Sequence, residues 1–349
     1  MNAGLAPSPA HVITVTGPAG EAAFGCPPSH TVLFAGQAAG WDLPYECASG
    51  GCGTCRAQLL SGEVTSLWPA ATGLTGRDRR RGDRILLCQS RPATACTLRS
   101  QAGLRRLSRK APRPARYDCV ITAMSQLTPA MLQLQLQANR PVRYLPGQFV
   151  ILEMPDGIRR PYSMSGRAGA PPGRLEMLIR NKPGGAASRW LFAGLGAGGH
   201  LIAEGPYGRA HAQSPPERPV ICVAGGSGLG QVLTIAEQCL AADANRPLTL
   251  YYGARSTADL VLAERINGLR DRGAVVIVVT ETAGPGADPL WGPVRTGLVP
   301  DAVAADHGDL TGHDIYLAGP DGMISALLAR LVRTNRAAAD RVFFDRFWT

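Results

Sequence analysis

The pattern of apolar and polar residues changes at a proline-rich break at 214–219. Before the break, short apolar or alternating segments separated by turn residues predict β-strands. The strictest alternation, Leu-Gln-Leu-Gln-Leu-Gln at 132–137, is typical of a strand with one buried and one wet face. After the break, buried strands alternate with segments whose apolar residues recur at helical spacing, as at 229–240. This alternation indicates βαβ units and a parallel sheet.

The first predicted domain spans residues 11–101. Its segments at 11–16 and 96–99 have the composition of strands, and 31–39 has that of a short helix. Residues 102–116 are basic, contain two prolines and have almost no periodic apolar pattern. We therefore interpret 102–116 as a linker.

Two further domains are expected after this linker. Residues 117–213, with a second alternating segment at 175–179, favour an antiparallel barrel or sandwich. Residues 217–349 favour an α/β domain built around a parallel sheet. The strands expected in that sheet lie at 220–224, 248–252, 274–280, 315–318 and 342–344.

Composition is that of an ordinary packed globular protein. Of the 349 residues, 45% are hydrophobic and 18% are charged. No apolar run reaches the ~18 residues that a membrane span needs, and residues 1–17 lack a basic region followed by an apolar core. We expect a soluble cytoplasmic protein without a membrane span of its own.

The net charge of +10 is concentrated in two stretches, 77–84 and 105–116. Neither stretch interleaves aromatic residues with its arginines, so a nucleic-acid partner is not expected. The simplest interpretation is that both are solvated surface segments. The alternative for 77–84 is a docking surface for an acidic partner. Its basic residues are Arg77, Arg79, Arg80, Arg81 and Arg84.

Four cysteines have the spacing of a plant-type [2Fe–2S] site. Cys47, Cys52 and Cys55 form C-x4-C-x2-C, and Cys88 follows 33 residues later. Three glycines within the loop let its backbone bend tightly and aim N–H groups at the sulfurs. Structural zinc is the alternative, but it favours paired C-x2-C units.

The other five cysteines are scattered, and several lie in apolar strands. Without a signal peptide a disulfide framework is not favoured in a chain of this length. We expect them to be buried core thiols. They are Cys26, Cys96, Cys119, Cys222 and Cys239.

Three segments have residues suited to phosphates or flat rings. In 160–163, an Arg can pair with a pyrophosphate and a Tyr can stack on a ring; the Gly-rich turn at 183–188 can bind phosphate. Taken singly, such an arginine, tyrosine or glycine turn is more often part of an ordinary turn or of the core. The glycines at 223–230 lie between a strand and a helix, where a cofactor pyrophosphate can approach the helix N-terminus. After the next strand, Arg255 with no acidic neighbour favours the 2′-phosphate of NADPH.

Several of these segments resemble signatures of the ferredoxin–NADP reductase superfamily. The run Arg-Pro-Tyr-Ser at 160–163 and the Gly-Ala-Ala-Ser at 185–188 resemble its R-x-Y-S and G-x-x-S flavin signature. The segment at 225–231 resembles G-G-[ST]-G-x-x-P, with Gln231 in place of the proline. The segment beginning at Ala318 resembles C-G-P-P-x-M, with that alanine in place of the cysteine.

The resemblance implies roles for individual residues. Arg160 would hold the FAD pyrophosphate, with Gly185 and Ser188 on its other side. Tyr162 would stack on the isoalloxazine ring, and Ser163 would hydrogen-bond near its N5 atom.

It also implies the nicotinamide side of the site. Gly319 and Pro320 would lie beside the nicotinamide, and Phe347 would cover the flavin ring unless it is a core aromatic. The family preference for NADH opposes the preference that Arg255 suggests for NADPH. The glycine turn expected at the cofactor pyrophosphate consists of Gly225, Gly226, Ser227 and Gly228.

The order of the three domains resembles the reductase components of bacterial aromatic and alkyl-group oxygenases. It implies a β-grasp plant-type ferredoxin domain, an antiparallel β-barrel FAD domain and an α/β parallel-sheet NAD(P) domain. Electrons would pass from NADH, or NADPH, through FAD and the [2Fe–2S] cluster to a terminal oxygenase component of the membrane-bound or Rieske type. The alternatives are a non-oxygenase acceptor and a cluster-based redox sensor. The three complete cofactor motifs argue against the sensor.

Overall fold

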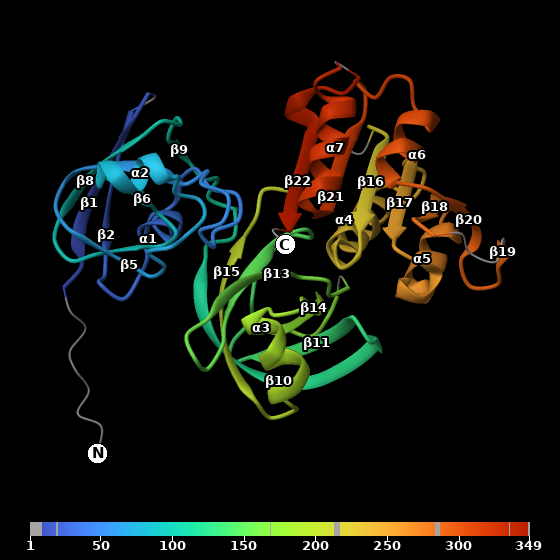
Figure 1. Ribbon diagram of the computed structural model, residues 1–349, viewed down its shortest axis with the longest axis horizontal. Coiled ribbons are helices and arrows are strands. Elements are labelled where there is room, and N and C mark those ends of the chain that lie inside the picture. The colour runs from blue at the N-terminus through green and yellow to red at the C-terminus, as the bar shows by residue number, and fades with distance from the viewer. Residues whose placement is uncertain are drawn as a thin grey trace. The chain divides into compact units, whose positions relative to one another are not determined.

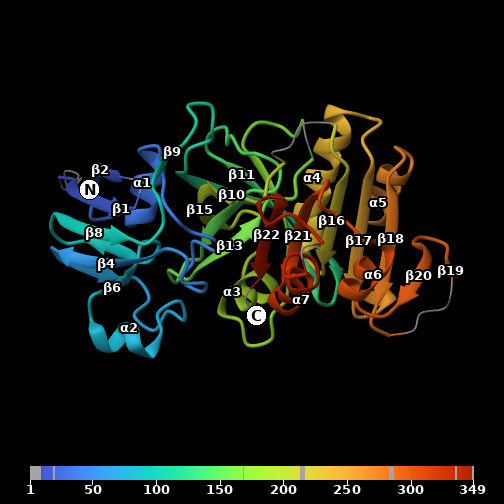
Figure 2. The same ribbon diagram turned by 90° about the horizontal axis from the view of Figure 1, so that it is seen from above.

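The computed structural model describes residues 9–18, 20–167, 169–212, 217–282, 287–334 and 336–347. The chain divides into two compact units, Met1–Ala115 and Arg116–Thr349. Figures 1 and 2 show their elements in two views.

The first unit has a five-stranded sheet in the order β2-β1-β8-β4-β6. β1 and β2 form an antiparallel hairpin, and β1 pairs in parallel with β8. A helix, α1, packs on this sheet, which gives the mixed sheet and helix expected of a β-grasp domain. The bounds are β1 His11–Gly17, β2 Gly20–Cys26, α1 Val32–Ala38, β4 Arg56–Ser61, β6 Arg84–Leu86 and β8 Cys96–Ser100.

Local sequence explains the start of α1. The side chain of Thr31 accepts a hydrogen bond from the N–H of Phe34, which satisfies one of the free donors of the first turn. Val32, Leu33 and Phe34 then bury their side chains in the domain core. The helix predicted at 31–39 is confirmed, as are the strands predicted at 11–16 and 96–99.

The segment expected as a linker has more structure than its sequence suggests. β9 (Arg105–Arg106) pairs with β3 (Trp41–Asp42), and the Arg106 guanidinium lies 3.6 Å from the centre of the Trp41 ring. This cation–π contact ties the first part of 102–116 to the first unit. A second small ladder joins β5 (Val64–Ser66) to β7 (Ser90–Pro92).

The second unit begins with a six-stranded barrel in the order β13-β12-β15-β10-β11-β14. A bridge between Met164 and Met177 brings the end of β13 against β14 and closes the barrel. The segments predicted at 132–137 and 175–179 lie in β11 and β14 and pair antiparallel. The bounds are β10 Ala115–Thr128, β11 Met131–Ala138, β12 Phe149–Glu153, β13 Arg159–Ser163, β14 Arg174–Arg180 and β15 His200–Tyr207.

The rest of this unit is a seven-stranded sheet in the order β19-β20-β18-β17-β16-β21-β22. All its neighbouring pairs are parallel except the edge pair of β19 and β20. The strand bounds are β16 Val220–Gly225, β17 Leu248–Ala254, β18 Val275–Thr280, β19 Ala287–Asp288, β20 Gly292–Thr296, β21 Asp314–Pro320 and β22 Val342–Phe347.

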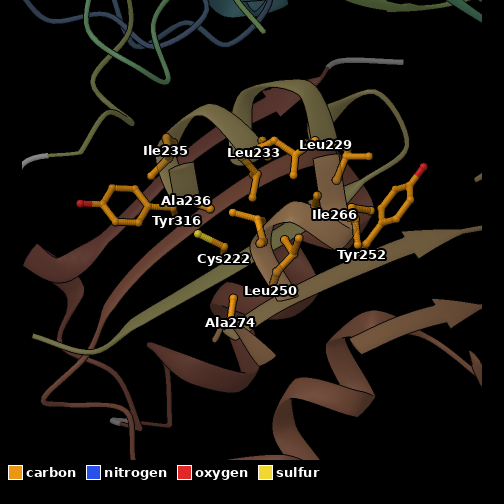
Figure 3. Packing of buried hydrophobic residues seen from close by; sticks show 14 of the residues in the cluster. Cys222, Leu229, Leu233, Ile235, Ala236, Leu250, Tyr252, Ile266, Ala274 and Tyr316 are labelled. Atoms are coloured by element: carbon orange, nitrogen blue, oxygen red, sulfur yellow. The ribbon is translucent and has the colours of Figure 1, made fainter. Parts of the chain in front are cut away.

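Helices cover both faces of this sheet. On one face, Leu229 and Leu233 of α4 and Ile266 of α5 pack on Cys222 and Tyr252 of the strands (Figure 3). On the other face, side chains of α6 and α7 pack on the alternate strand positions. The helix bounds are α4 Gly228–Ala242, α5 Ala263–Arg270, α6 Val299–Asp306 and α7 Asp321–Leu331.

These three folds confirm the predicted fold class. The five cysteines outside the cluster motif are buried, as predicted. Among the described residues, no helix has the length and apolar character that crossing a membrane requires. The proline-rich break predicted at 214–219 lies partly outside the described residues.

Candidate functional site

The four motif cysteines lie on two segments of the first unit. Cys47, Cys52 and Cys55 belong to the loop between β3 and β4, and Cys88 follows directly after β6. Cys52 is half-buried and the other three are buried. Both segments that carry the thiols are thus attached to short strands of the first unit.

Glycines give the loop its shape. Gly50 and Gly53 have φ angles of 91° and 78°, a left-handed region that glycine adopts without strain. A Cβ on Gly53 would lie 2.7 Å from the carbonyl oxygen of Gly73, so the following segment packs directly on the loop. The N–H of Gly73 also donates to the carbonyl of Gly50 at 2.9 Å.

Backbone N–H groups point at the sulfurs. Ser49 and Cys52 donate to the Cys47 Sγ at 3.5 and 3.4 Å, and Thr54 donates to the Cys52 Sγ at 3.4 Å. The neighbouring Cys52 thiol, together with these N–H groups, lowers the pKa of Cys47 to about 5 although burial opposes it, whereas pairing with Cys47 and burial raise the pKa of Cys52. The pair therefore favours a thiolate at Cys47, and the thiolate is the form that binds metal.

The thiols fall into two pairs, which fits a two-iron cluster. The Cys52 N–H donates to the Cys47 Sγ at 3.4 Å, and the Sγ atoms of Cys55 and Cys88 lie 3.3 Å apart. Within the described ranges, no group of three or more His, Cys, Asp or Glu side chains is placed to hold one metal ion. A structural zinc needs four ligands around one ion, whereas each iron of a [2Fe–2S] cluster takes two from the protein. The residues present fit the cluster better than zinc.

The predicted flavin residues lie on the closing strand of the barrel. β13 pairs antiparallel with β12, which places Tyr162 opposite Val150 and Ser163 opposite Phe149. Tyr162 and Ser163 are half-buried, and Arg160 is exposed at the other end of the strand. Burial raises the pKa of the Tyr162 hydroxyl to about 12.

The predicted phosphate turn follows the neighbouring strand β14. Gly185 caps the short helix α3 (Ala186–Arg189), and a Cβ there would lie 3.0 Å from the Lys182 carbonyl oxygen and 3.1 Å from the Ser188 Oγ. The Ser188 Oγ accepts a hydrogen bond from the Lys182 N–H at 3.0 Å. The Met164–Met177 bridge makes β13 and β14 neighbours. The segment 160–163 within β13 and the turn 183–188 after β14 therefore belong to neighbouring strands of the barrel.

The glycine turn predicted for the nicotinamide cofactor joins β16 to α4. Gly226 has φ 55°, and its N–H donates to the Gly253 carbonyl at 3.0 Å. A Cβ on Gly228 would lie 2.2 Å from the Ala318 carbonyl oxygen, so the helix starts in direct contact with β21. Ser227, at the N-cap, makes no side-chain capping bond.

The remaining predicted residues lie at the same edge of the sheet. β16 and β21 are parallel neighbours, so Gly225 and Gly319 both stand at carboxyl ends, and a Cβ on Gly319 would lie 3.0 Å from the Gly225 nitrogen. Phe347 pairs with Pro320 in the next parallel strand and is half-buried. Arg255 follows β17 and is exposed. Ligands of open parallel sheets bind at this edge.

Two residues at this site were not among the sequence candidates. Arg180, at the end of β14, has its Nη1 only 3.5 Å from where a Cβ of Gly226 would be, so a barrel arginine reaches the glycine turn. Gln231 is 1% exposed and hydrogen-bonds across to the barrel. In the sequence, Gln231 could be noticed because it stands where the motif G-G-[ST]-G-x-x-P has a proline. No sequence pattern pointed to Arg180.

Gly228 tests the tight contact at the start of α4. Gly228→Ala is expected to destabilise the second unit by about 1–3 kcal/mol, because the added methyl overlaps the Ala318 carbonyl and one backbone must move. Calorimetry of the FAD-loaded protein would measure this as a lower unfolding temperature. The control is Gly268→Ala in α5, where nothing lies within 4 Å of the added methyl and a gain of up to about 1 kcal/mol is expected. Equal effects of the two substitutions would contradict the packing described.

Family models match all three parts of the chain. A 2Fe-2S iron-sulfur cluster binding domain matches residues 15–93, an oxidoreductase FAD-binding domain matches 119–211, and an oxidoreductase NAD-binding domain matches 222–328. The chain is 42% identical over 324 residues to the ferredoxin–NAD(+) reductase component of the alkene monooxygenase system of Xanthobacter autotrophicus, covering 93% of this chain and 97% of that protein. The chain belongs to the family of ferredoxin–NAD(P)+ reductase components.

Further relatives of this reductase match over its whole length. It is 30% identical to the xylene/toluene monooxygenase electron transfer component of Pseudomonas putida, over 98% of this chain and 95% of that protein. The solved ferredoxin reductase in carbazole 1,9a-dioxygenase has a TM-score of 0.83 and 32% identity, and the match covers 97% of this chain and 99% of that chain. The reductase is an electron-transfer oxidoreductase with domains for a [2Fe–2S] cluster, FAD and NAD, so the predicted cofactors are confirmed.

Proposed function

We propose that this reductase passes electrons from NADH, or NADPH, to the terminal component of an oxygenase system. The observation that carries the proposal is the 42% identity, over nearly the full length, to a reductase of an alkene monooxygenase system. Xylene/toluene monooxygenase and naphthalene dioxygenase reductases among its other relatives support an oxygenase acceptor. A cytoplasmic location belongs to the same proposal.

The residue assignments are part of this proposal. Each cofactor is held by the segment whose geometry suits it. The thiols of Cys47, Cys52, Cys55 and Cys88 hold the cluster. Arg160, Tyr162, Ser163, Gly185 and Ser188 hold FAD on the barrel, and Phe347 covers its ring. Gly225, Gly226, Ser227, Gly228, Arg255, Gly319 and Pro320 hold the nicotinamide cofactor at the edge of the parallel sheet. The domain limits 11–101, 117–213 and 217–349 follow the same division.

The protein's own contribution is binding and orientation. When bound, FAD accepts the electron pair of a nicotinamide and releases single electrons, which a plant-type cluster can take one at a time. Tyr162 and Phe347 orient the ring and keep water from it. The N–H groups of Ser49, Cys52 and Thr54 stabilise negative charge on the cysteine sulfurs.

Recovery of the partner from the source cell, followed by an NADH-dependent oxygenation assay, tests whether the acceptor is an oxygenase component. A tagged reductase should recover an oxygenase component, and the two proteins together should convert an alkene or aromatic substrate with NADH and O2. The same mixture without the reductase should be inactive. An acceptor that turns over without incorporating oxygen would contradict the oxygenase assignment while leaving the electron-transfer activity intact.

The basic helix α2 (Gly76–Arg81) is the proposed docking surface for this partner. None of its residues is buried, and its acidic residue, Asp78, pairs with Arg56 at 2.8 Å and accepts hydrogen bonds from Thr75 in a capping box. The helix also stands next to the cluster loop, because the segment before it packs on Gly50 and Gly53. The surface it offers is therefore positive and near the cluster, which suits an acidic face of the oxygenase component.

Reversing the positive charge of α2 should slow electron transfer to the partner. Arg80→Glu with Arg81→Glu is expected to lower the rate constant for partner reduction on the order of tenfold at low salt, and added salt should shrink the difference. The control is Arg99→Glu, an exposed arginine on β8, which should have little effect. Stopped-flow reduction of the isolated partner measures the rate constant for the wild type, the double variant and the control. A salt-independent rate that is equal in all variants would exclude this docking role.

A further inference from the structure

Gln231 joins three separate segments of the second unit. It lies in the first turn of α4 and is almost completely buried. Its Oε1 accepts a hydrogen bond from the Ser163 Oγ at 3.0 Å, and its Nε2 donates to the Gly147 carbonyl at 2.8 Å. The Nε2 also donates to the carboxylate of Asp345 on β22. One side chain thus connects the barrel, the nucleotide domain and the last strand.

The surroundings fix which way the amide of Gln231 faces. The Gly147 carbonyl can only accept a hydrogen bond, so it must face a hydrogen of the amide nitrogen, on the same side as Asp345. A flipped amide would place its oxygen against two other oxygens. The amide oxygen must therefore face Ser163, and the Ser163 hydroxyl must be the donor in that contact.

Tight backbone packing holds this arrangement in place. A Cβ on Gly230 would lie 2.9 Å from the Ser165 Cβ and 3.0 Å from the Leu178 Cβ, so the first turn of α4 touches the barrel. A Cβ on Gly147 would lie 2.2 Å from the Ala210 carbonyl oxygen. The backbone at both glycines therefore packs closely against other segments of the second unit.

A serine hydroxyl has one hydrogen, and here Gln231 takes it. The oxygen of Ser163 can offer only lone pairs in its remaining directions. Any group that meets Ser163 from another side must then be a donor to be stabilised. Such a group can approach Ser163, because this residue is not fully buried.

We propose that Gln231 is a positioning residue that fixes Ser163 as a hydrogen-bond acceptor toward N5 of FAD. The inference rests on the proposed flavin site, in which Ser163 stands near N5. Reduced flavin has a hydrogen on N5 and oxidised flavin has only a lone pair there. An acceptor-only Ser163 therefore stabilises the reduced form selectively and raises the midpoint potential of the flavin. The proline that the motif G-G-[ST]-G-x-x-P has at this position cannot accept a hydrogen bond from Ser163 through its side chain.

Spectroelectrochemical titration of FAD in the full-length holoprotein tests the inference. Gln231→Leu should lower the flavin midpoint potential, because the freed hydroxyl can then donate to oxidised N5. Ser163→Ala should also lower it. Adding Gln231→Leu to Ser163→Ala should give no further shift, because Gln231 acts through the hydroxyl. An unchanged or raised potential in Gln231→Leu would overturn the inference, and so would additive shifts in the double variant.

Gln231→Pro is a second test variant in case Gln231→Leu does not fold. It removes the same hydrogen bonds with the residue that the resembling motif carries, and the same downward shift is expected. The matched control is Gln133→Leu, which removes a glutamine–carboxylate hydrogen bond to Glu176 in the same barrel; its potential should equal the wild-type value. If Ser163→Ala itself leaves the potential and the flavin spectrum unchanged, the proposed flavin site is wrong. If Ser163→Ala alone shifts them, only the role of Gln231 fails.

Discussion

Cys52→Ser is expected to separate the two halves of the electron path. The variant should bind FAD normally and keep NAD(P)H-dependent ferricyanide reduction, because the residues proposed for FAD and the nicotinamide all lie in the second unit. Cytochrome c reduction should fall to a small remainder and partner turnover should be lost almost completely, because a serine hydroxyl is a poor replacement for a thiolate ligand. Steady-state assays with the three acceptors measure the split.

Cys96→Ser is the matched control for this variant. Cys96 lies in the same unit, is buried, and its thiol contacts the carbonyls of Glu63 at 3.4 Å and Thr94 at 3.3 Å. A serine can make the same contacts, so all three activities should remain. Partner turnover surviving in Cys52→Ser would mean that the flavin feeds the acceptor directly.

Tyr162→Ala should produce the opposite pattern. Removing the ring takes away the aromatic surface proposed to stack on the flavin, so NAD(P)H-driven reduction of every acceptor should be nearly lost. The cluster should still form in the first unit and accept an electron from dithionite. Absorbance of the cluster after NADH and then dithionite, under anaerobic conditions, distinguishes the two routes.

Tyr162→Phe shows whether the ring or the hydroxyl matters. The phenylalanine keeps the flat ring and loses only the hydroxyl, so activity should stay within about fivefold of wild type, which corresponds to about 1 kcal/mol for one hydrogen bond. Equal losses in the phenylalanine and alanine variants would assign the role to the hydroxyl instead of the ring.

The elements that the sequence predicted best are those in which local and tertiary signals agree. The apolar spacing at 229–240 matches α4 because the whole inner face of that helix is buried against strands. The short helix predicted at 31–39 is found at Val32–Ala38, with Thr31 as its N-cap. The cysteine spacing located the thiol loop because three ligands must come from one short turn.

Contacts between distant segments could not be predicted in this way. The pairing of β9 with β3 depends on an arginine meeting Trp41 more than sixty residues away, and short polar segments have no periodic signal. Gln231 was visible only as a departure from a motif. Its function depends on Ser163 and Asp345, which approach it only when the barrel and the last strand have folded around α4.

Anaerobic reduction of the purified holoprotein by NADH tests the central claim most directly. The account predicts that NADH alone, without partner or mediator, bleaches the flavin and produces the electron paramagnetic resonance signal of a reduced [2Fe–2S] cluster. A flavin that is reduced by NADH while the cluster stays oxidised, although dithionite reduces it, would contradict the account.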